Sequence, residues 1–142
     1  MAVAGCASTE QNADTINVQS EVSPNKARIY VMRTARFFGD GTAFELSMSG
    51  IQRETGRDYS RVIGQLGPKS YLCWDAAPGV VYLSFEEGEP GNKKELTLQR
   101  GQTYYLRVML REGYLSPEFI LESLTDAEGK ALLKKCKPPK KI

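Results

Sequence analysis

Apolar and polar residues alternate in short runs along most of the chain between residues 27 and 124. The most regular run spans residues 103–110 and follows a glycine at position 101. One side of a period-two element would carry Tyr104, Leu106, Val108 and Leu110, and the other side would carry Thr103, Tyr105, Arg107 and Met109. This run predicts a central strand with one face in the core and a second face that is only partly covered.

Further runs of strand-favouring residues are separated by turn residues such as Asp40-Gly41 and Pro78-Gly79. These runs are 27–33, 42–49, 61–66, 70–74, 80–85, 95–98 and 118–124. The polar stretch 50–60 and the charged stretch 86–94 are predicted to be loops. Together the runs predict an all-β fold, an antiparallel β-sandwich of about seven to eight strands. A short helix is expected over 126–135, although Gly129 disfavours it.

The length of 142 residues fits one domain with tails. Residues 1–26 contain a polar stretch typical of a flexible tether. Residues 27–136 are expected to form the sandwich with its helix, and 137–142 a basic tail. A hydrophobic content of 41% and a charged content of 25% are those of a soluble globular protein, and the net charge of +2 is too small to suggest a polyanion partner.

The chain contains no histidine. This removes the most common general base and zinc ligand, so we expect a protein that is not an enzyme and needs no metal or cofactor. The carboxylates Glu86, Glu87 and Glu89 share one loop, but their spacing matches no calcium loop and a solvated turn is the simpler interpretation. No serine has an activating partner in the sequence.

The N-terminal residues Val3-Ala4-Gly5-Cys6 resemble the bacterial lipobox, in which small residues precede the cysteine that receives lipid. No basic and apolar leader precedes them. The resemblance implies lipidation of Cys6 and a membrane contact through that anchor. Because Ala7 and Ser8 follow the cysteine, the implied location is the periplasmic face of the outer membrane, with the cell surface as an open alternative.

Once Cys6 is assigned to lipidation, Cys73 and Cys136 remain. An even pair in an exported protein is a disulfide candidate that would fasten the C-terminal helix to the strand carrying Trp74. The alternative is a buried free thiol at Cys73 and an exposed one at Cys136.

Two groups of side chains are candidate contact surfaces. Lysines gather near the C-terminus at positions Lys134, Lys135, Lys137, Lys140 and Lys141. They either contact anionic groups of a membrane or protein or form a solvated tail, and no aromatic residues interleave with them as nucleic-acid binding would require. Tyr105 and Arg107, with Tyr30 and Tyr82 on neighbouring strands, are a candidate binding face. A second packed layer beneath a loop or the C-terminal helix is the favoured alternative.

Several short turn-plus-strand segments resemble a family of small bacterial lipoproteins of unknown function, with a logic similar to PEGA-type and transthyretin-like sandwiches. The segments are 27–31, 64–66, Ser70-Tyr71, Pro78-Gly79 and 101–107. The resemblance covers residues 27–124 and implies a fold and a location, with no catalytic residues. The expected function is therefore a tethered envelope lipoprotein that binds a protein or cell-wall component, and a small-ligand or carbohydrate-binding module is the alternative.

Overall fold

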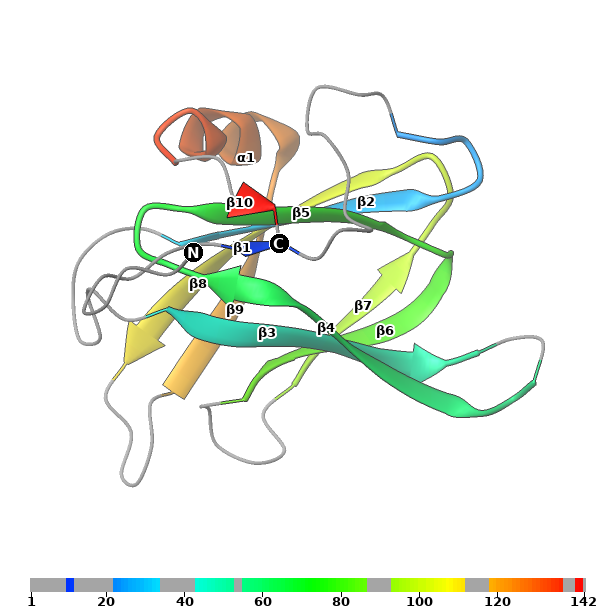
Figure 1. Ribbon diagram of the computed structural model, residues 1–142. Helices are drawn as coiled ribbons and strands as arrows, with labels where there is room; N and C mark the ends of the chain where they lie inside the picture. Colours follow the sequence, from blue (N-terminus) through cyan, green and yellow to red (C-terminus); the bar gives the residue numbers. More distant parts are fainter. Residues whose placement is uncertain are drawn as a thin grey trace.

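The computed structural model describes residues 10–11, 22–33, 43–52, 55–86, 93–111, 118–136 and 140–141. Eight strands form two four-stranded sheets that pack face to face, and one helix lies on the outside of one sheet (Figure 1). The eight strands are β2 (Ala27–Arg33), β3 (Phe44–Ile51), β4 (Asp58–Leu66), β5 (Tyr71–Ala76), β6 (Gly79–Phe85), β7 (Lys94–Leu98), β8 (Thr103–Arg111) and β9 (Glu118–Leu124). The predicted sandwich with a short C-terminal helix is confirmed.

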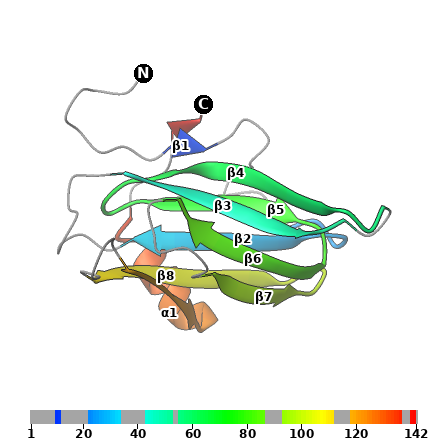
Figure 2. The same ribbon diagram turned by 90° about the horizontal axis from the view of Figure 1, so that it is seen from below.

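The strand order is β4-β3-β6-β7 in one sheet and β5-β2-β8-β9 in the other. We call the first the open sheet and the second the covered sheet, because the helix α1 (Asp126–Leu133) packs only on the second (Figure 2). All pairs among these eight strands are antiparallel except β2 with β8, which is parallel. Two-residue strands β1 (Glu10–Gln11) and β10 (Lys140–Lys141) extend the open sheet beyond β4.

The main core fills the space between the sheets, as the alternating pattern predicts. Phe44, Leu46 and Met48 of β3 point inward, and the residues between them are half-buried on the other side. Leu106 and Val108 of β8 are also in this core. The fully buried indole of Trp74 on β5 adds the largest side chain.

A second layer of buried side chains lies on the far side of the covered sheet, under α1. Its buried members are Tyr30, Met32, Tyr71, Cys73 and Tyr105, and we call this set the covered layer. Because both faces of the covered sheet are packed, every residue of its strand β2 is buried. The rings of Tyr30 and Tyr105 stack with centroids 5.1 Å apart.

Helix α1 begins with a capping box, in which Thr125 and Glu128 satisfy each other's backbone N–H groups. Hydrogen bonds from the backbone and side chain of Thr125 lower the pKa of Glu128. Gly129 is buried where the helix meets the sheet, and a Cβ atom at this position would overlap the ring of Tyr105. The glycine that disfavours this helix by propensity therefore allows its close approach to the sheet.

Several predicted boundaries differ from the structure, most of all those of the stretch 50–60 and the end of the helix. The stretch 50–60 was expected to be a loop, but β3 continues to Ile51 and β4 begins at Asp58. At the end of this hairpin Gln52 N donates to Arg57 O, and Gly56 lies in the left-handed region at φ 68°. The prediction failed here because Asp58 and Ser60 are polar residues on an exposed strand face, and such a pattern resembles a loop. Helix α1 ends at Leu133, two residues before the predicted end.

Candidate functional site

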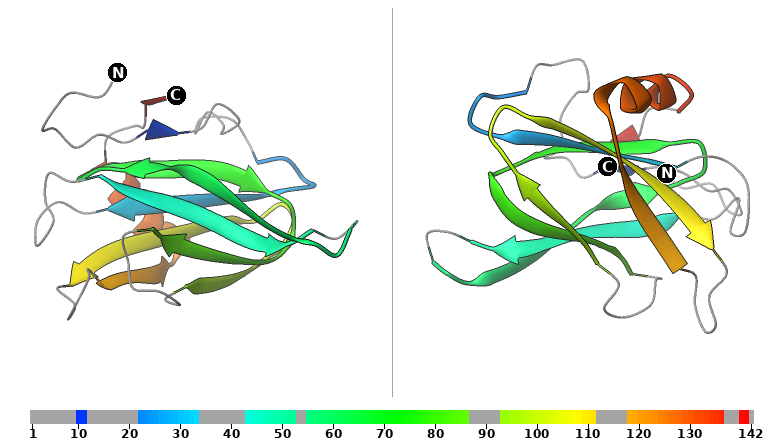
Figure 3. Two further views of the ribbon diagram at one scale, coloured as in Figure 1. Left: turned by 60° about the horizontal axis from the view of Figure 1, so that its bottom comes forward. Right: turned by 180° about the vertical axis from the view of Figure 1, so that it is seen from behind.

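The two sheets are joined on one side and separate on the other (Figure 3). On the first side, residues 67–70 carry the chain directly from β4 of the open sheet to β5 of the covered sheet. On the opposite side, β7 and β9 are the last strands of their sheets, and no described strand joins them. A crevice of about 190 Å³ lies there, lined by Leu83, Ser84, Phe85, Lys93, Lys94, Glu118, Phe119, Ile120 and Leu121.

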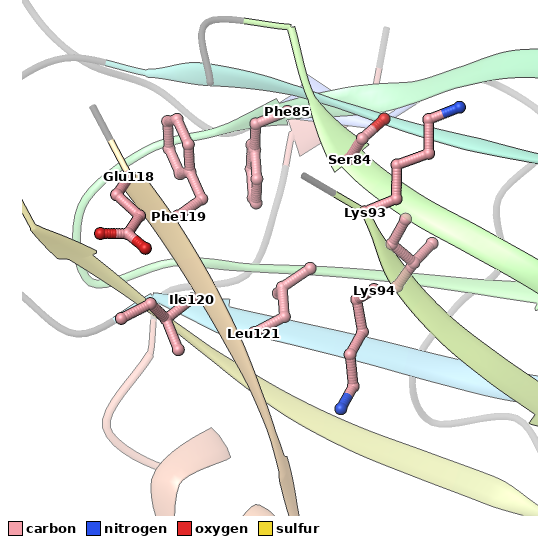
Figure 4. Close-up of a pocket in the computed structure, with 9 residues that line it drawn as sticks. Ser84, Phe85, Lys93, Lys94, Glu118, Phe119, Ile120 and Leu121 are labelled. Atoms are coloured by element: carbon pink, nitrogen blue, oxygen red, sulfur yellow. The ribbon is translucent and has the colours of Figure 1, made fainter. Parts of the chain in front are cut away.

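Aromatic rings from both sheets form the floor of the crevice. Phe85 of β6 and Phe119 of β9 stack with centroids 4.4 Å apart and an interplanar angle of 17° (Figure 4). Phe44 meets the same Phe119 ring edge-on at 5.0 Å. Each of the three rings is at least nine-tenths buried, so the floor is a fixed part of the core.

The rim of the crevice is positively charged on the β7 side. Lys94 pairs with Leu83 in the β6–β7 ladder, so it occupies an inward-facing position on an edge strand and is half-buried. Figure 4 shows the side chains of Lys93 and Lys94 leaving the chain in opposite directions. It also shows Glu118 and Ile120 on the other side of β9 from Phe119 and Leu121. Two ammonium groups and the one carboxylate of Glu118 therefore line the crevice, which leaves a net positive charge on the β7 side.

The outer face of the open sheet is a second candidate surface. The exposed large hydrophobic residues of the described chain are Ile51, Val62, Val80 and Tyr82, with exposed fractions of 66%, 42%, 44% and 36%. All of them lie on this face. Val62 pairs with Ser47 and Tyr82 pairs with Ser49, and both serines are on the outer side of β3. Gly50 and Val81 form an inward-facing pair, so their chain neighbours Ile51 and Val80 face outward. Figure 2 shows no helix over this sheet.

Short hydroxyl side chains fill much of the remaining outer face. These are Ser47, Ser49, Ser60, Ser84 and Thr97. The charged side chains on the face are Glu45, Asp58 and Glu95, and no lysine or arginine occupies an outward position of the open sheet's four long strands. The face therefore carries apolar residues among short hydroxyl groups and has negative charge, although the whole chain has a net charge of +2.

The structure separates the residues of the predicted Tyr/Arg binding face. Tyr30 and Tyr105 are only 5% and 8% exposed, because they belong to the covered layer beneath α1. Arg107 forms an ion pair with Glu122 of the neighbouring β9. Tyr82 lies on β6, in the other sheet. A single face made of these four side chains does not exist, and the second packed layer considered from the sequence is what two of them form.

Burial holds the covered layer in its neutral protonation state. It raises the pKa of the Cys73 thiol to about 12 and that of the Cys136 thiol to about 11. Burial also raises the pKa of Tyr30, Tyr71 and Tyr105. Both cysteines are free thiols in the structure, so the predicted disulfide is not formed there. Cys136 nonetheless packs against the covered layer that contains Cys73.

One ion pair sits at the margin of the covered layer. Arg28 Nε donates to Asp75 Oδ1 at 3.0 Å and Nη2 to Oδ2 at 3.4 Å, between residues directly opposite on β2 and β5. Burial alone would lower the pKa of Arg28, but the hydrogen bond and charge of Asp75 outweigh it and the pKa is raised. A two-point contact of this kind fixes the register of the pair.

The other predicted site residues are only partly described. Lys134 and Lys135 follow α1 and are exposed, and Lys140 and Lys141 form β10, where they pair with Glu10 and Gln11. Cys6 and Lys137 lie outside the described residues, as do Glu87 and Glu89.

Sequence reasoning missed the crevice and the outer face of the open sheet. Phe85 and Phe119 are 34 positions apart in the sequence, and alternation does not reveal which strands end opposite each other. The signal for the outer face was present in the serines between the apolar residues of β3, but it had no meaning until the sheet was known to be uncovered.

A shallow depression of about 640 Å³ near Asn25, Pro78, Gln99 and Arg100 encloses little surface, since three of these residues are exposed.

The chain matches no protein-family model, no curated protein and no solved structure. What remains of the family resemblance is the two-sheet β-sandwich, and no family is identified. No described helix is long and apolar enough to cross a membrane. Within the described ranges, no group of three or more His, Cys, Asp or Glu side chains can hold a metal ion.

Proposed function

We propose that this protein is a non-enzymatic binding module that contacts a partner protein through the outer face of its open sheet. The observation that carries the proposal is the gathering of Ile51, Val62, Val80 and Tyr82 on that face. Single exposed apolar residues are common on soluble proteins, but a group on one flat surface is typical of an interaction site. The other sheet covers its own outer face with α1.

The side chains of the face also indicate the chemistry of the partner. Serine and threonine are short, so another flat surface can approach the backbone closely and exchange hydrogen bonds with the hydroxyl groups. Glu45, Asp58 and Glu95 favour a partner with lysine or arginine around an apolar centre. Two copies of this chain joined by the same face would bring carboxylates together, so a different, basic protein is the better candidate.

The alternative of a small-ligand or carbohydrate-binding module through the Tyr/Arg face receives no support. Tyr30 and Tyr105 are covered, so they cannot stack on a sugar. The crevice of about 190 Å³ is smaller than the roughly 300–1,000 Å³ of typical small-molecule sites.

Residue-specific photo-crosslinking in the native host tests the proposed surface. A photoreactive amino acid at Val80 should give one discrete crosslinked product, because that side chain is exposed on the face beside Ile51. The same amino acid at Lys130, an exposed position on α1, is the matched control and should give none. A product from Lys130 and not from Val80 would overturn the proposal.

We also propose that the module is held at the periplasmic face of a bacterial outer membrane by lipid on Cys6. The support is the lipobox-like sequence before that cysteine. Membrane fractionation of the native gene product, with an intact mass, tests this independently of the contact face. Wild type should partition to the outer membrane with a lipid-sized mass increment, whereas Cys6→Ala should remain soluble. Soluble, unmodified protein in both cases would overturn the anchor and leave the contact face untouched.

A further inference from the structure

The crevice between β7 and β9 has three features that belong together. Its floor is aromatic, its mouth carries two lysines, and it lies between the last strands of the two sheets (Figure 4). It opens between the two sheets and shares Ser84 with the outer face of the open sheet, but its aromatic floor lies on the inner side, so it is tested apart from the proposal above.

The size of the crevice limits its occupant. A volume of about 190 Å³ is too small for a typical drug-sized ligand or cofactor, which needs roughly 300 Å³ or more. It is large enough to receive one large apolar side chain. Phe85, Phe119 and Leu121 would surround that side chain on the floor and on one wall, where an aromatic ring can stack or meet a ring edge-on.

The strand at the crevice offers a backbone to bind. β9 pairs with β8 on one side, and along 120–124 no described strand pairs with its other side. Alternate backbone N–H and C=O groups of an edge strand point outward and can accept an additional strand. A peptide that adds to such an edge gains affinity from main-chain hydrogen bonds, and its alternate side chains enter pockets that give specificity.

The two lysines of the crevice indicate the charge that a bound peptide strand should carry. In an extended peptide, residues two positions apart point to the same face and lie about 7 Å from each other. When one apolar side chain enters the crevice, the side chains two positions before and after it reach the mouth. Lys93 and Lys94 extend in opposite directions there, so carboxylates at those two positions would meet an ammonium group.

We infer that the crevice binds an extended acidic peptide, which adds as a strand to β9 and inserts one apolar side chain between the sheets. Lys94 supports this assignment, because it lines the crevice from a half-buried, inward-facing position on the edge strand β7. An inward-facing lysine on an edge strand also discourages pairing with a neutral strand of another copy. The same residue therefore favours an acidic strand over an uncharged one.

The test uses a labelled synthetic peptide, Thr-Glu-Val-Phe-Val-Glu-Thr, with its two glutamates and its phenylalanine on one face. Fluorescence anisotropy with the full chain should show saturable binding. Lys93→Glu combined with Lys94→Glu should weaken the binding at least about tenfold, since two attractive charge pairs become repulsive. The matched control combines Lys26→Glu with Lys130→Glu, two exposed lysines away from the crevice, and should leave the affinity unchanged.

Four altered peptides distinguish strand addition from general attraction. Replacing phenylalanine by alanine, or both glutamates by lysine, should abolish binding. N-methylation of the edge that faces β9 should also abolish it, whereas N-methylation of the other edge should not. Amide shifts in NMR spectra should map to β9 and β7. No saturable binding, equal loss in the control variant, or shifts on the outer face of the open sheet would each overturn the inference.

Discussion

The outer faces of the two sheets differ in what covers them. On the covered sheet, tyrosines, a methionine and a cysteine form a continuous buried layer beneath α1. On the open sheet, serines separate four exposed apolar side chains, and no described element lies above them. The difference shows that a period-two pattern alone does not distinguish a packed second face from a free one. The size and aromatic content of the residues between the core positions do.

The carboxylates of the two sheets differ in the same way. The aspartate on the covered side, Asp75, is held by Arg28 in a two-point ion pair that is mostly buried. The aspartate on the open side, Asp58, is exposed at the end of β4. One carboxylate is therefore part of the fold, and the other is available to a partner.

The largest expected effect comes from breaking that ion pair. Asp75→Ala removes the carboxylate that pairs with the mostly buried guanidinium of Arg28, which should lower the free energy of unfolding by roughly 3 kcal/mol. Asp58→Ala, the corresponding change on the open sheet, should alter it by less than about 0.5 kcal/mol. Urea denaturation followed by circular dichroism measures both. Equal effects would mean that the two faces do not differ in this respect.

Gly129→Ala tests how closely α1 must approach the covered layer. Alanine favours a helix over glycine by about 1 kcal/mol, yet here its Cβ would overlap the ring of Tyr105. The overlap should dominate and reduce the free energy of unfolding by about 1–2 kcal/mol, with a changed near-ultraviolet signal from the tyrosines. Ala131→Gly, on the exposed side of the helix, is the control and should leave the near-ultraviolet tyrosine signal unchanged. A stabilised Gly129→Ala protein would contradict the packing.

Alkaline pH should destabilise the covered layer selectively. The folded protein holds the thiols of Cys73 and Cys136 in their protonated form, with pKa values of about 12 and about 11. The unfolded chain loses these protons near pH 8.5, so this stabilisation is complete below about pH 8 and falls as the pH rises toward 11. Cys136→Ser should make the decrease less steep, as measured by urea denaturation at several pH values. Tyr82→Phe on the open sheet should not, and an identical slope in all three proteins would refute this account.

The smallest effect on stability is expected on the outer face of the open sheet. Val80→Lys should change the free energy of unfolding by less than about 0.5 kcal/mol, because its side chain is already exposed to water. It should nevertheless prevent the partner contact made at this face. Leu132→Lys is the comparison, because this side chain of α1 packs against the covered layer, and it should destabilise the protein clearly. A strongly destabilised Val80→Lys variant would show that the face is structural.

Much of the fold was predictable from the sequence. The alternation of Phe44, Leu46 and Met48 gave β3 its inward face, and the Pro78-Gly79 turn marked the start of β6. The parallel pairing of β2 with β8 was not predictable, because local patterns carry no information about which distant strands are neighbours. For the same reason Tyr30 and Tyr82 looked equivalent in sequence, although they lie in different sheets.

The candidate sites depended even more on tertiary structure. The crevice exists because Phe85 and Phe119 meet where the sheets separate, and neither residue differs in sequence from an ordinary core residue. Gly129 disfavours the predicted helix by propensity, and only the position of the Tyr105 ring explains why a glycine is needed there. Such features arise from the contact between elements, so the sequence of each element alone cannot show them.

Carboxyl-group footprinting tests the central distinction between the two faces most directly. A water-soluble carbodiimide with an amine probe would label the purified protein and the same protein in intact native envelopes. We predict that Asp58 and Glu95 are labelled readily in the purified protein and are protected in the envelopes, whereas Asp75 is labelled weakly in both because it is mostly buried against Arg28. Equal labelling of Asp58 and Glu95 in the two preparations would contradict the proposal that the open sheet is a contact surface.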